Sequence, residues 1–140
     1  MVTRRLALAA ALVGAGVAAA PAAAEDVVVR DRDGRAMQFQ IDVADADVRD
    51  YARILRRSVH GPEITKVTVR VASLADVVHA CGDGGTSGCY VGGERRGLIV
   101  IPAGAPDEIR HVLLHEYGHH VDAFRGGTRA AREPNGTWRW

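Results

Sequence analysis

Residues 112–122, VLLHEYGHHVD, decide how this sequence is interpreted. They place two histidines four residues apart, His115 and His119, with Glu116 directly after the first. Residues four apart lie on one face of an α-helix, so the two imidazoles can hold one Zn²⁺ while Glu116 leans toward a metal-bound water. In a chain of 140 residues with 6 histidines, this pattern is expected by chance only about 0.01 times. The spacing therefore predicts a metal-binding helix with Glu116 as the general base.

The predicted helix extends from this motif in both directions. Pro106 suits a first helical turn, in which Asp107 and Glu108 interact favourably with the helix dipole. The glycines at 126 and 127 are expected to end the helix after residue 124. Its apolar residues predict burial, and buried histidines are costly unless a metal or a hydrogen-bond partner holds them. These apolar residues are Val112, Leu113, Leu114 and Val121.

Residues 112–122 resemble the active-site helix of zincin metallopeptidases, notably small secreted bacterial ones with HEYGHH-type motifs. The resemblance implies that His115 and His119 bind zinc and that Glu116 is the general base in peptide-bond hydrolysis. It implies an α+β, zincin-like fold, with a small twisted, mostly antiparallel sheet, one packing helix and the active-site helix. Residues 98–101 match the sheet edge that usually precedes this helix, to which an extended peptide substrate would add as a further strand.

The third zinc ligand is not evident from the sequence. The metzincin pattern needs Gly at position 122 and His at 125, where this chain has Asp122 and Arg125, and that subclass is excluded. A gluzincin takes a glutamate from a second helix, for which the 21 residues after His119 leave no room. Three candidates remain within the chain. They are Asp122, preferred as a partner that orients a histidine, Glu133 and His111.

Other residues near the motif have weaker expectations. Tyr90 and His111 are candidates for stabilising an oxyanion, and His120 is expected at the surface because it points away from the metal side. The sequence ends on Trp138, Arg139 and Trp140, which resemble the start of an element that would bury the indoles. This ending suggests a truncated chain whose third ligand was encoded downstream.

The remaining pattern predicts strands and one further helix. Residues 27–29 and 37–43 flank the turn signal Asp33-Gly34 and predict an antiparallel hairpin. Residues 48–59 have helical apolar spacing, with Asp45 or Asp47 as cap and Gly61-Pro62 as the end. Residues 64–71 alternate as a half-buried strand whose valines face inward. Residues 90–91 and 98–101 predict a looser second hairpin, and residues 74–80 have no assigned structure.

Cys81 and Cys89 are the only cysteines, and a glycine-rich segment separates them. This spacing predicts a disulfide, and the alternative is a metal site that includes His79. The N-terminus supports an oxidising compartment. Residues 1–24 combine two arginines, an apolar run and a small-residue cleavage site, which is typical of a secretory signal, and the run is short for a membrane anchor.

Composition limits the remaining possibilities. The chain has 140 residues, 47% of them hydrophobic, with 18 Lys+Arg against 17 Asp+Glu. Residues 25–140 therefore predict one small domain, secreted and monomeric, without a membrane anchor or a nucleic-acid partner. A peptide or protein substrate and a Zn²⁺ cofactor are expected. The alternatives to a zinc metallopeptidase are an inactive zincin-like metal-binding or interaction module, and a buried histidine network without metal.

Overall fold

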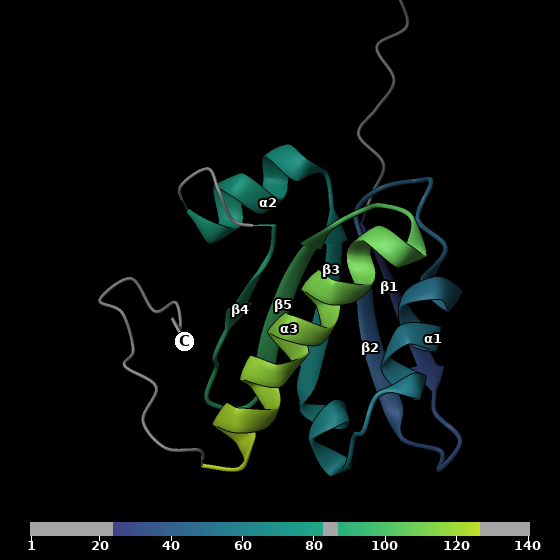
Figure 1. Ribbon diagram of the computed structural model, residues 1–140, viewed down its shortest axis with the longest axis vertical. Coiled ribbons are helices and arrows are strands. Elements are labelled where there is room, and N and C mark those ends of the chain that lie inside the picture. The colour runs from purple at the N-terminus through teal and green to yellow at the C-terminus, as the bar shows by residue number, and fades with distance from the viewer. Residues whose placement is uncertain (1–23, 83–86, 127–140) are drawn as a thin grey trace, which may run out of the picture.

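The computed structural model describes residues 24–82 and 87–126 (Figure 1). Residues 1–23 of the predicted signal, and Glu133, Trp138 and Trp140, lie outside the described residues. Within the described residues, no helix is both long enough and apolar enough to cross a membrane. The elements in chain order are β1 (Glu25–Arg30), β2 (Ala36–Ile41), α1 (Val48–Arg57), the 3-10 helix η1 (Pro62–Lys66), β3 (Val67–Ala72), α2 (Leu74–Cys81), β4 (Cys89–Val91), β5 (Gly97–Pro102) and α3 (Pro106–Phe124).

The five strands form one mixed sheet in the order β1-β2-β3-β5-β4, and the fold is α+β as predicted. The expectation of a mostly antiparallel sheet is wrong. The outer pairs β1/β2 and β4/β5 are antiparallel, but β2/β3 and β3/β5 are parallel. Helix α1 connects β2 to β3, and α2 with β4 connects β3 to β5, so that the central strands run in the same direction.

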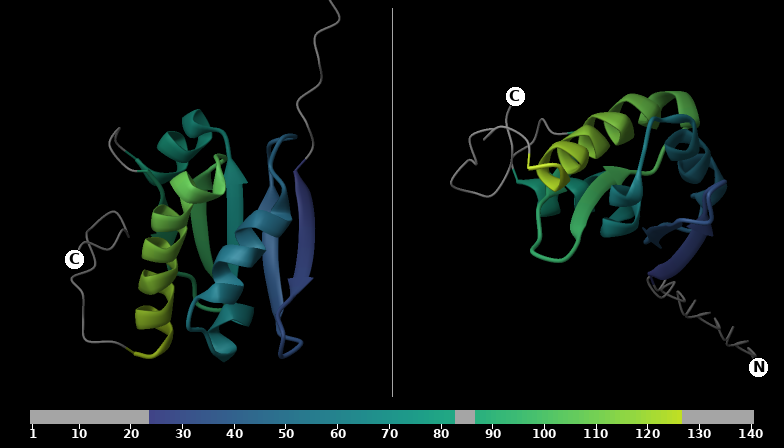
Figure 2. Two further views of the ribbon diagram at one scale, coloured as in Figure 1. Left: turned by 45° about the vertical axis from the view of Figure 1, so that its right-hand side comes forward. Right: turned by 90° about the horizontal axis from the view of Figure 1, so that it is seen from below.

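The helices α1 and α3 lie together on one face of the sheet (Figures 1 and 2). The main core lies between them and the strands, where Phe39, Val69 and Ile99 meet Tyr51 and Leu113. A second, smaller cluster forms around α2. It contains Ala72, Val77, Cys81, Cys89 and Val100, and Val100 alternates along β5 with the core residues Ile99 and Ile101. Because neighbouring strand residues point to opposite faces, α2 packs on the face opposite to α3.

Several predicted boundaries shift for local reasons. The predicted strand 64–71 begins only at Val67, because Pro62 starts a 3-10 turn. Val67, Val69 and Val71 are buried as predicted. Helix α1 ends at Arg57, and its N-cap is Asp47, whose side chain accepts a hydrogen bond from the Arg49 N–H at 2.9 Å. Residues 74–81, which had no predicted structure, form α2 with Ser73 as its N-cap.

Both predicted hairpins are present, but one of their strands has a different role. β1 and β2 join through a turn in which Gly34 has φ 79°, a conformation that favours glycine. β4 and β5 form the second hairpin. Residues 98–101 lie in β5, between β3 and β4, so they are interior rather than the expected sheet edge. The edge strand on that side is β4.

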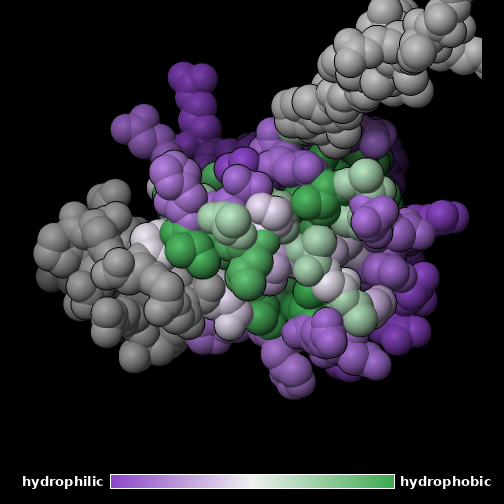
Figure 3. Space-filling model, turned by 90° about the horizontal axis from the view of Figure 1, so that it is seen from above, coloured by the Kyte–Doolittle hydropathy of each residue, from purple (hydrophilic) through white to green (hydrophobic). Residues whose placement is uncertain are grey.

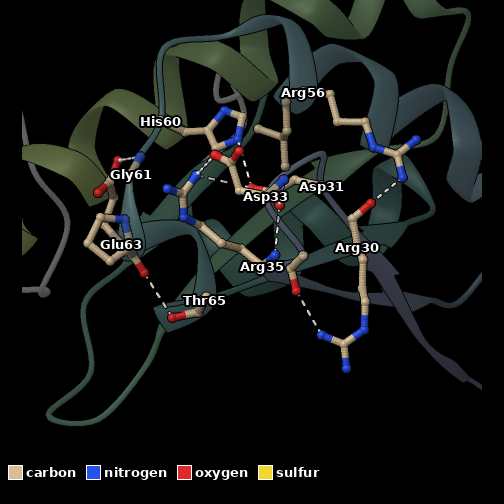
Figure 4. Close-up of polar contacts among 12 residues, drawn as sticks. Arg30, Asp31, Asp33, Arg35, Arg56, His60, Gly61, Glu63 and Thr65 are labelled. Carbon is tan, nitrogen blue, oxygen red and sulfur yellow. Dashed lines mark hydrogen bonds and ion pairs between the residues drawn. The ribbon is translucent and has the colours of Figure 1, made fainter.

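Asp31 organises the β1–β2 turn (Figure 4). Its Oδ1 accepts hydrogen bonds from the backbone N–H groups of Asp33 and Arg35, at 2.9 and 2.7 Å. Its Oδ2 faces His60 Nε2 at 3.1 Å, and His60 Nδ1 faces the Ser58 carbonyl at 2.9 Å. Through these contacts His60 joins the turn to the segment that follows α1.

Asp31→Asn should lower the free energy of unfolding at neutral pH by about 2 kcal/mol, because charge-assisted hydrogen bonds are lost. Burial raises the pKa of Asp31, but hydrogen bonds from Arg35, His60 and Asp33 outweigh it and leave the pKa below its usual 3.8. The stabilisation is present above the usual value and is lost as the pH falls through the lowered one. Urea unfolding should show the variant's deficit shrinking in strong acid, and an equal deficit at every pH would contradict this account. The exposed Asp33→Asn serves as the control.

The predicted disulfide joins Cys81, at the end of α2, to Cys89, at the start of β4, with Cα atoms 5.7 Å apart. The sequence separation is 8 residues. Replacing both cysteines with alanine should lower the free energy of unfolding by about 2.5 kcal/mol in the chain-entropy picture. Urea unfolding of the oxidised protein and the double variant measures this difference. Equal stabilities would show that the bridge does not constrain the unfolded chain.

Candidate metal centre

Helix α3 positions the candidate metal ligands. It begins after Ala105, with Pro106 in its first turn and the Glu108 side chain accepting from the Ala105 N–H at 3.4 Å. Its buried residues Ile109, Leu113 and Tyr117 belong to the main core, and the helix packs against β5 and β4. This packing fixes the rotation of the helix. The helix ends at Phe124, as the sequence predicts.

His115, Glu116 and His119 lie together. Each offers one ligand atom, and these atoms lie within 4.8 Å of one another. The Nε2 atoms of His115 and His119 are 3.1 Å apart, and their ring planes are 84° apart. Two nitrogens bound to one tetrahedral Zn²⁺ at 2.0–2.1 Å would be separated by about 3.3 Å. The same distance also suits an N–H···N hydrogen bond between two neutral imidazoles. The rings are therefore arranged so that a metal ion could replace a shared proton.

The electrostatics of the cluster suit a buried base beside a neutral His119. Glu116 is 8% exposed, and burial raises its pKa against the opposing effects of His115 and of a hydrogen bond from the Tyr90 backbone. Burial, together with His115, lowers the pKa of His119, while Asp122 acts in the opposite direction. A lowered pKa keeps His119 neutral near pH 7, and metal binding needs the neutral form.

The short edge strand β4 lies beside the cluster. The Tyr90 N–H donates to the Glu116 carboxylate, so that the backbone of β4 fixes the side chain of the candidate base. The disulfide holds the start of this strand to α2. Thus the sheet edge that borders the cluster is β4, although the sequence assigned that role to the neighbouring strand.

The other candidate ligands occupy different positions. His111 is exposed one turn before His115, and Asp122 is half-buried beyond His119. In the described part of the chain, the metal-capable group contains only His115, Glu116 and His119. Glu133 lies outside the described residues. The charge of Asp122 acts to raise the pKa of His119.

His120 is buried, and the expectation that it lies at the surface is wrong. It is 3% exposed, because α3 lies over both η1 and the β4–β5 hairpin at this point. Its Nε2 donates to the Glu63 carbonyl at 2.9 Å, which leaves Nδ1 to accept from the Tyr90 hydroxyl at 3.3 Å. Burial lowers the pKa of His120 and favours this neutral tautomer. The Tyr90 hydroxyl, a candidate oxyanion partner, thus contacts His120 in the interior.

Glu63 is a second buried residue that the sequence did not indicate. It is 1% exposed, and its carboxylate accepts from the Gly61 N–H at 2.6 Å and the Tyr117 hydroxyl at 3.3 Å. Burial raises its pKa, but hydrogen bonds from the backbone of Glu63 itself and of Gly61, the nearby Arg125 and the Tyr117 hydroxyl outweigh it and lower the pKa overall. Glu63 and His120 therefore join η1 to the end of α3. His120 directly follows the metal-capable His119.

His120→Phe should lower the free energy of unfolding by about 2 kcal/mol, because the buried Glu63 carbonyl and Tyr90 hydroxyl lose their partner. Zinc affinity should change little, since the ligand atoms of His115 and His119 do not contact this network. Thermal unfolding and zinc titration of the same variant separate the two effects. A large loss of zinc affinity with unchanged stability would make His120 part of the metal centre.

The chain was compared with known families, curated proteins and solved structures. No family model matches it, and no curated protein or solved structure is significantly similar to it. The cluster on α3 is therefore the feature of this chain that bears most directly on its function.

Proposed function

We propose that the protein is an exported zinc-dependent peptidase. The observation that carries the proposal is the cluster of His115, Glu116 and His119, whose ligand atoms lie within 4.8 Å of one another beside a sheet edge. Its support also includes the resemblance of this helix to that of the zincins. Export is supported by the N-terminal sequence and by a disulfide, which is compatible with an oxidising compartment.

Zinc is the metal that this donor set favours. Two imidazole nitrogens from consecutive turns suit a borderline-soft ion, and the two Nε2 atoms are spaced for a tetrahedral site. A catalytic zinc site takes three protein ligands and leaves one position open for water. We assign His115 and His119 to two of these positions, with Asp122, His111 and Glu133 as candidates for the third position or as partners that orient a histidine.

When bound, zinc would activate water and polarise a peptide carbonyl. Within the proposal, Glu116 accepts a proton from water and then gives it to the departing amine. Its raised pKa suits this double role, because a carboxylate with a pKa closer to neutrality returns a proton more readily. The Tyr90 N–H holds the carboxylate toward the cluster while the carboxylate takes up and releases the proton.

The peptide substrate would bind along β4. This strand is the edge of the sheet, and an edge strand presents backbone groups to which an extended peptide can pair. A peptide paired there would pass close to Glu116, because Tyr90 belongs to β4 and contacts that carboxylate. Binding at this edge would leave β5 covered on both sides.

A second candidate is a secreted metal-binding or interaction module without turnover. It is favoured by the metal-capable group, which contains two histidines and one glutamate within residues 24–82 and 87–126. The end of the molecule that carries α2 also shows an apolar area framed by hydrophilic residues (Figure 3). Such areas often mark interaction sites. This candidate predicts zinc binding without proteolysis.

Zinc content and casein hydrolysis, measured on the same preparation of the full chain, test the proposal. The peptidase proposal predicts about one zinc per chain and new peptide termini in the digest. Bound zinc with no cleavage at high protein concentration would favour the module instead. A melting temperature that a chelator leaves unchanged, with no zinc present, would favour the metal-free histidine network.

A further inference from the structure

A cavity of about 950 Å³ lies at the turn between β4 and β5. The hairpin residues 92–97 form one wall, and the last turn of α3, with Ala123 and Phe124, forms another. Lys66, at the end of η1, also lines the cavity. None of the three metal-capable residues lines it, so the cavity is a separate feature of the surface.

The cavity is strongly basic. Lys66, Arg95 and Arg96 all line it, and Glu94 is its only acidic residue. None of the three cations forms an ion pair with an acidic residue of the described chain, although Arg35, Arg49, Arg53 and Arg70 each pair with an aspartate. Arg96 instead donates to the Val67 carbonyl at 3.2 Å, which anchors its side chain beside the cavity. With three basic residues against one acidic residue, the lining has a net positive charge, which suits an anionic ligand.

Glycines give the cavity its shape. A Cβ on Gly93 would lie 2.4 Å from the Arg96 carbonyl oxygen, and one on Gly97 would lie 2.5 Å from the Tyr90 ring. Larger residues at these positions would therefore force the hairpin or Tyr90 to move. The two glycines therefore let the hairpin close tightly and pack against Tyr90 beside the cavity.

The cavity is close to the proposed peptidase centre. Tyr90 lines the cavity, and its backbone N–H binds the Glu116 carboxylate. Ala123 follows His119 by four residues, a rise of about 6 Å along the helix. A peptide residue advances about 3.3 Å in extended conformation. A group one or a few residues from the cleaved bond can therefore reach the cavity.

We propose that this cavity binds a carboxylate of the peptide substrate, on the side of the metal centre that faces the β4–β5 turn. The carboxylate belongs either to an acidic side chain or to the free C-terminus. Lys66 and Arg95 attract it, Arg96 fixes its position, and the exposed face of Phe124 packs against the neighbouring part of the peptide. This inference rests on the proposed function and adds a substrate class to it.

The test measures peptide binding to the full chain carrying Glu116→Gln, loaded with zinc, so that cleavage does not interfere. The probes are fluorescent alanine-based heptapeptides with a single Glu or Gln moved along the sequence, each with a free or an amidated C-terminus. Fluorescence anisotropy should show at least one acidic peptide binding about tenfold more tightly than its neutral counterpart. A gain with internal Glu identifies a side-chain carboxylate, and a gain with the free acid identifies the C-terminus.

Charge reversal then locates the binding site. The preference should disappear in a variant that adds Lys66→Glu and Arg95→Glu, and it should persist with Arg57→Glu, an exposed control on α1. Equal binding of acidic and neutral peptides, no binding of any peptide, or a preference that survives the reversal would each overturn the inference. If wild type cleaves no peptide, but the preference for acidic peptides is lost on charge reversal and kept in Arg57→Glu, the peptidase proposal fails and the carboxylate site stands.

Discussion

Glu116→Gln should lower kcat/KM for peptide hydrolysis by about 10²–10⁴-fold, the usual contribution of a general base. Glutamine keeps the shape and can still meet the Tyr90 N–H through its carbonyl oxygen, but it cannot take a proton from water. Zinc binding should change much less than the rate, because both histidines remain. Initial rates at several substrate concentrations, together with zinc content, measure the two effects.

The matched control is Glu108→Gln, an exposed glutamate in the first turn of the same helix. Gln can replace Glu in the contact with the Ala105 N–H, so this variant should keep wild-type activity. Equal rates for wild type and Glu116→Gln would remove Glu116 from catalysis. Loss of activity in both variants would indicate damage to α3 instead.

His119→Ala should lower zinc affinity by more than about 100-fold and abolish hydrolysis, because one of the two imidazole ligands is removed. His115→Ala should do the same. The stabilisation that zinc gives the folded chain should disappear with it, and at a zinc concentration 100 times Kd this amounts to about 2.7 kcal/mol. Calorimetric zinc titration and thermal unfolding with and without zinc test the pair.

Two further histidine variants make this result specific. His79→Ala, on α2 and exposed, should bind zinc like wild type. His111→Ala tests whether His111 is the third ligand. If it is, the loss of zinc affinity should be comparable to that in His115→Ala. Wild-type zinc affinity in His115→Ala and His119→Ala would show that the cluster is a hydrogen-bonded pair without metal.

The sequence predicted that His115 and His119 lie together, because that geometry is local. Two residues four apart on a helix must lie on one face, so His115 and His119 come together whatever surrounds them. Strand alternation predicted the inward face of Val67, Val69 and Val71 for the same reason. The disulfide could likewise be predicted from the short separation of Cys81 and Cys89 in the sequence.

The features that the sequence did not reveal depend on contacts between distant residues. His120 is buried by Glu63, which is 57 residues away, and a helical projection does not show what covers each side. The chain forms the edge strand β4 before the interior strand β5. A short apolar run in the sequence does not indicate which strands will pair with it. Helix α2 is only 8 residues long, too short for a clear period. The basic cavity joins η1, the hairpin and α3, and no local motif marks it.

We propose that zinc on His115 and His119 enables Glu116 to drive peptide hydrolysis. The most direct measurement removes metal from the full chain with a chelator, returns zinc in steps, and counts new casein termini by mass spectrometry. Cleavage should be absent without metal, rise to a plateau near one zinc per chain, and stay absent throughout in Glu116→Gln. Cleavage that persists without zinc, or none at full zinc occupancy, would contradict the zinc-peptidase proposal.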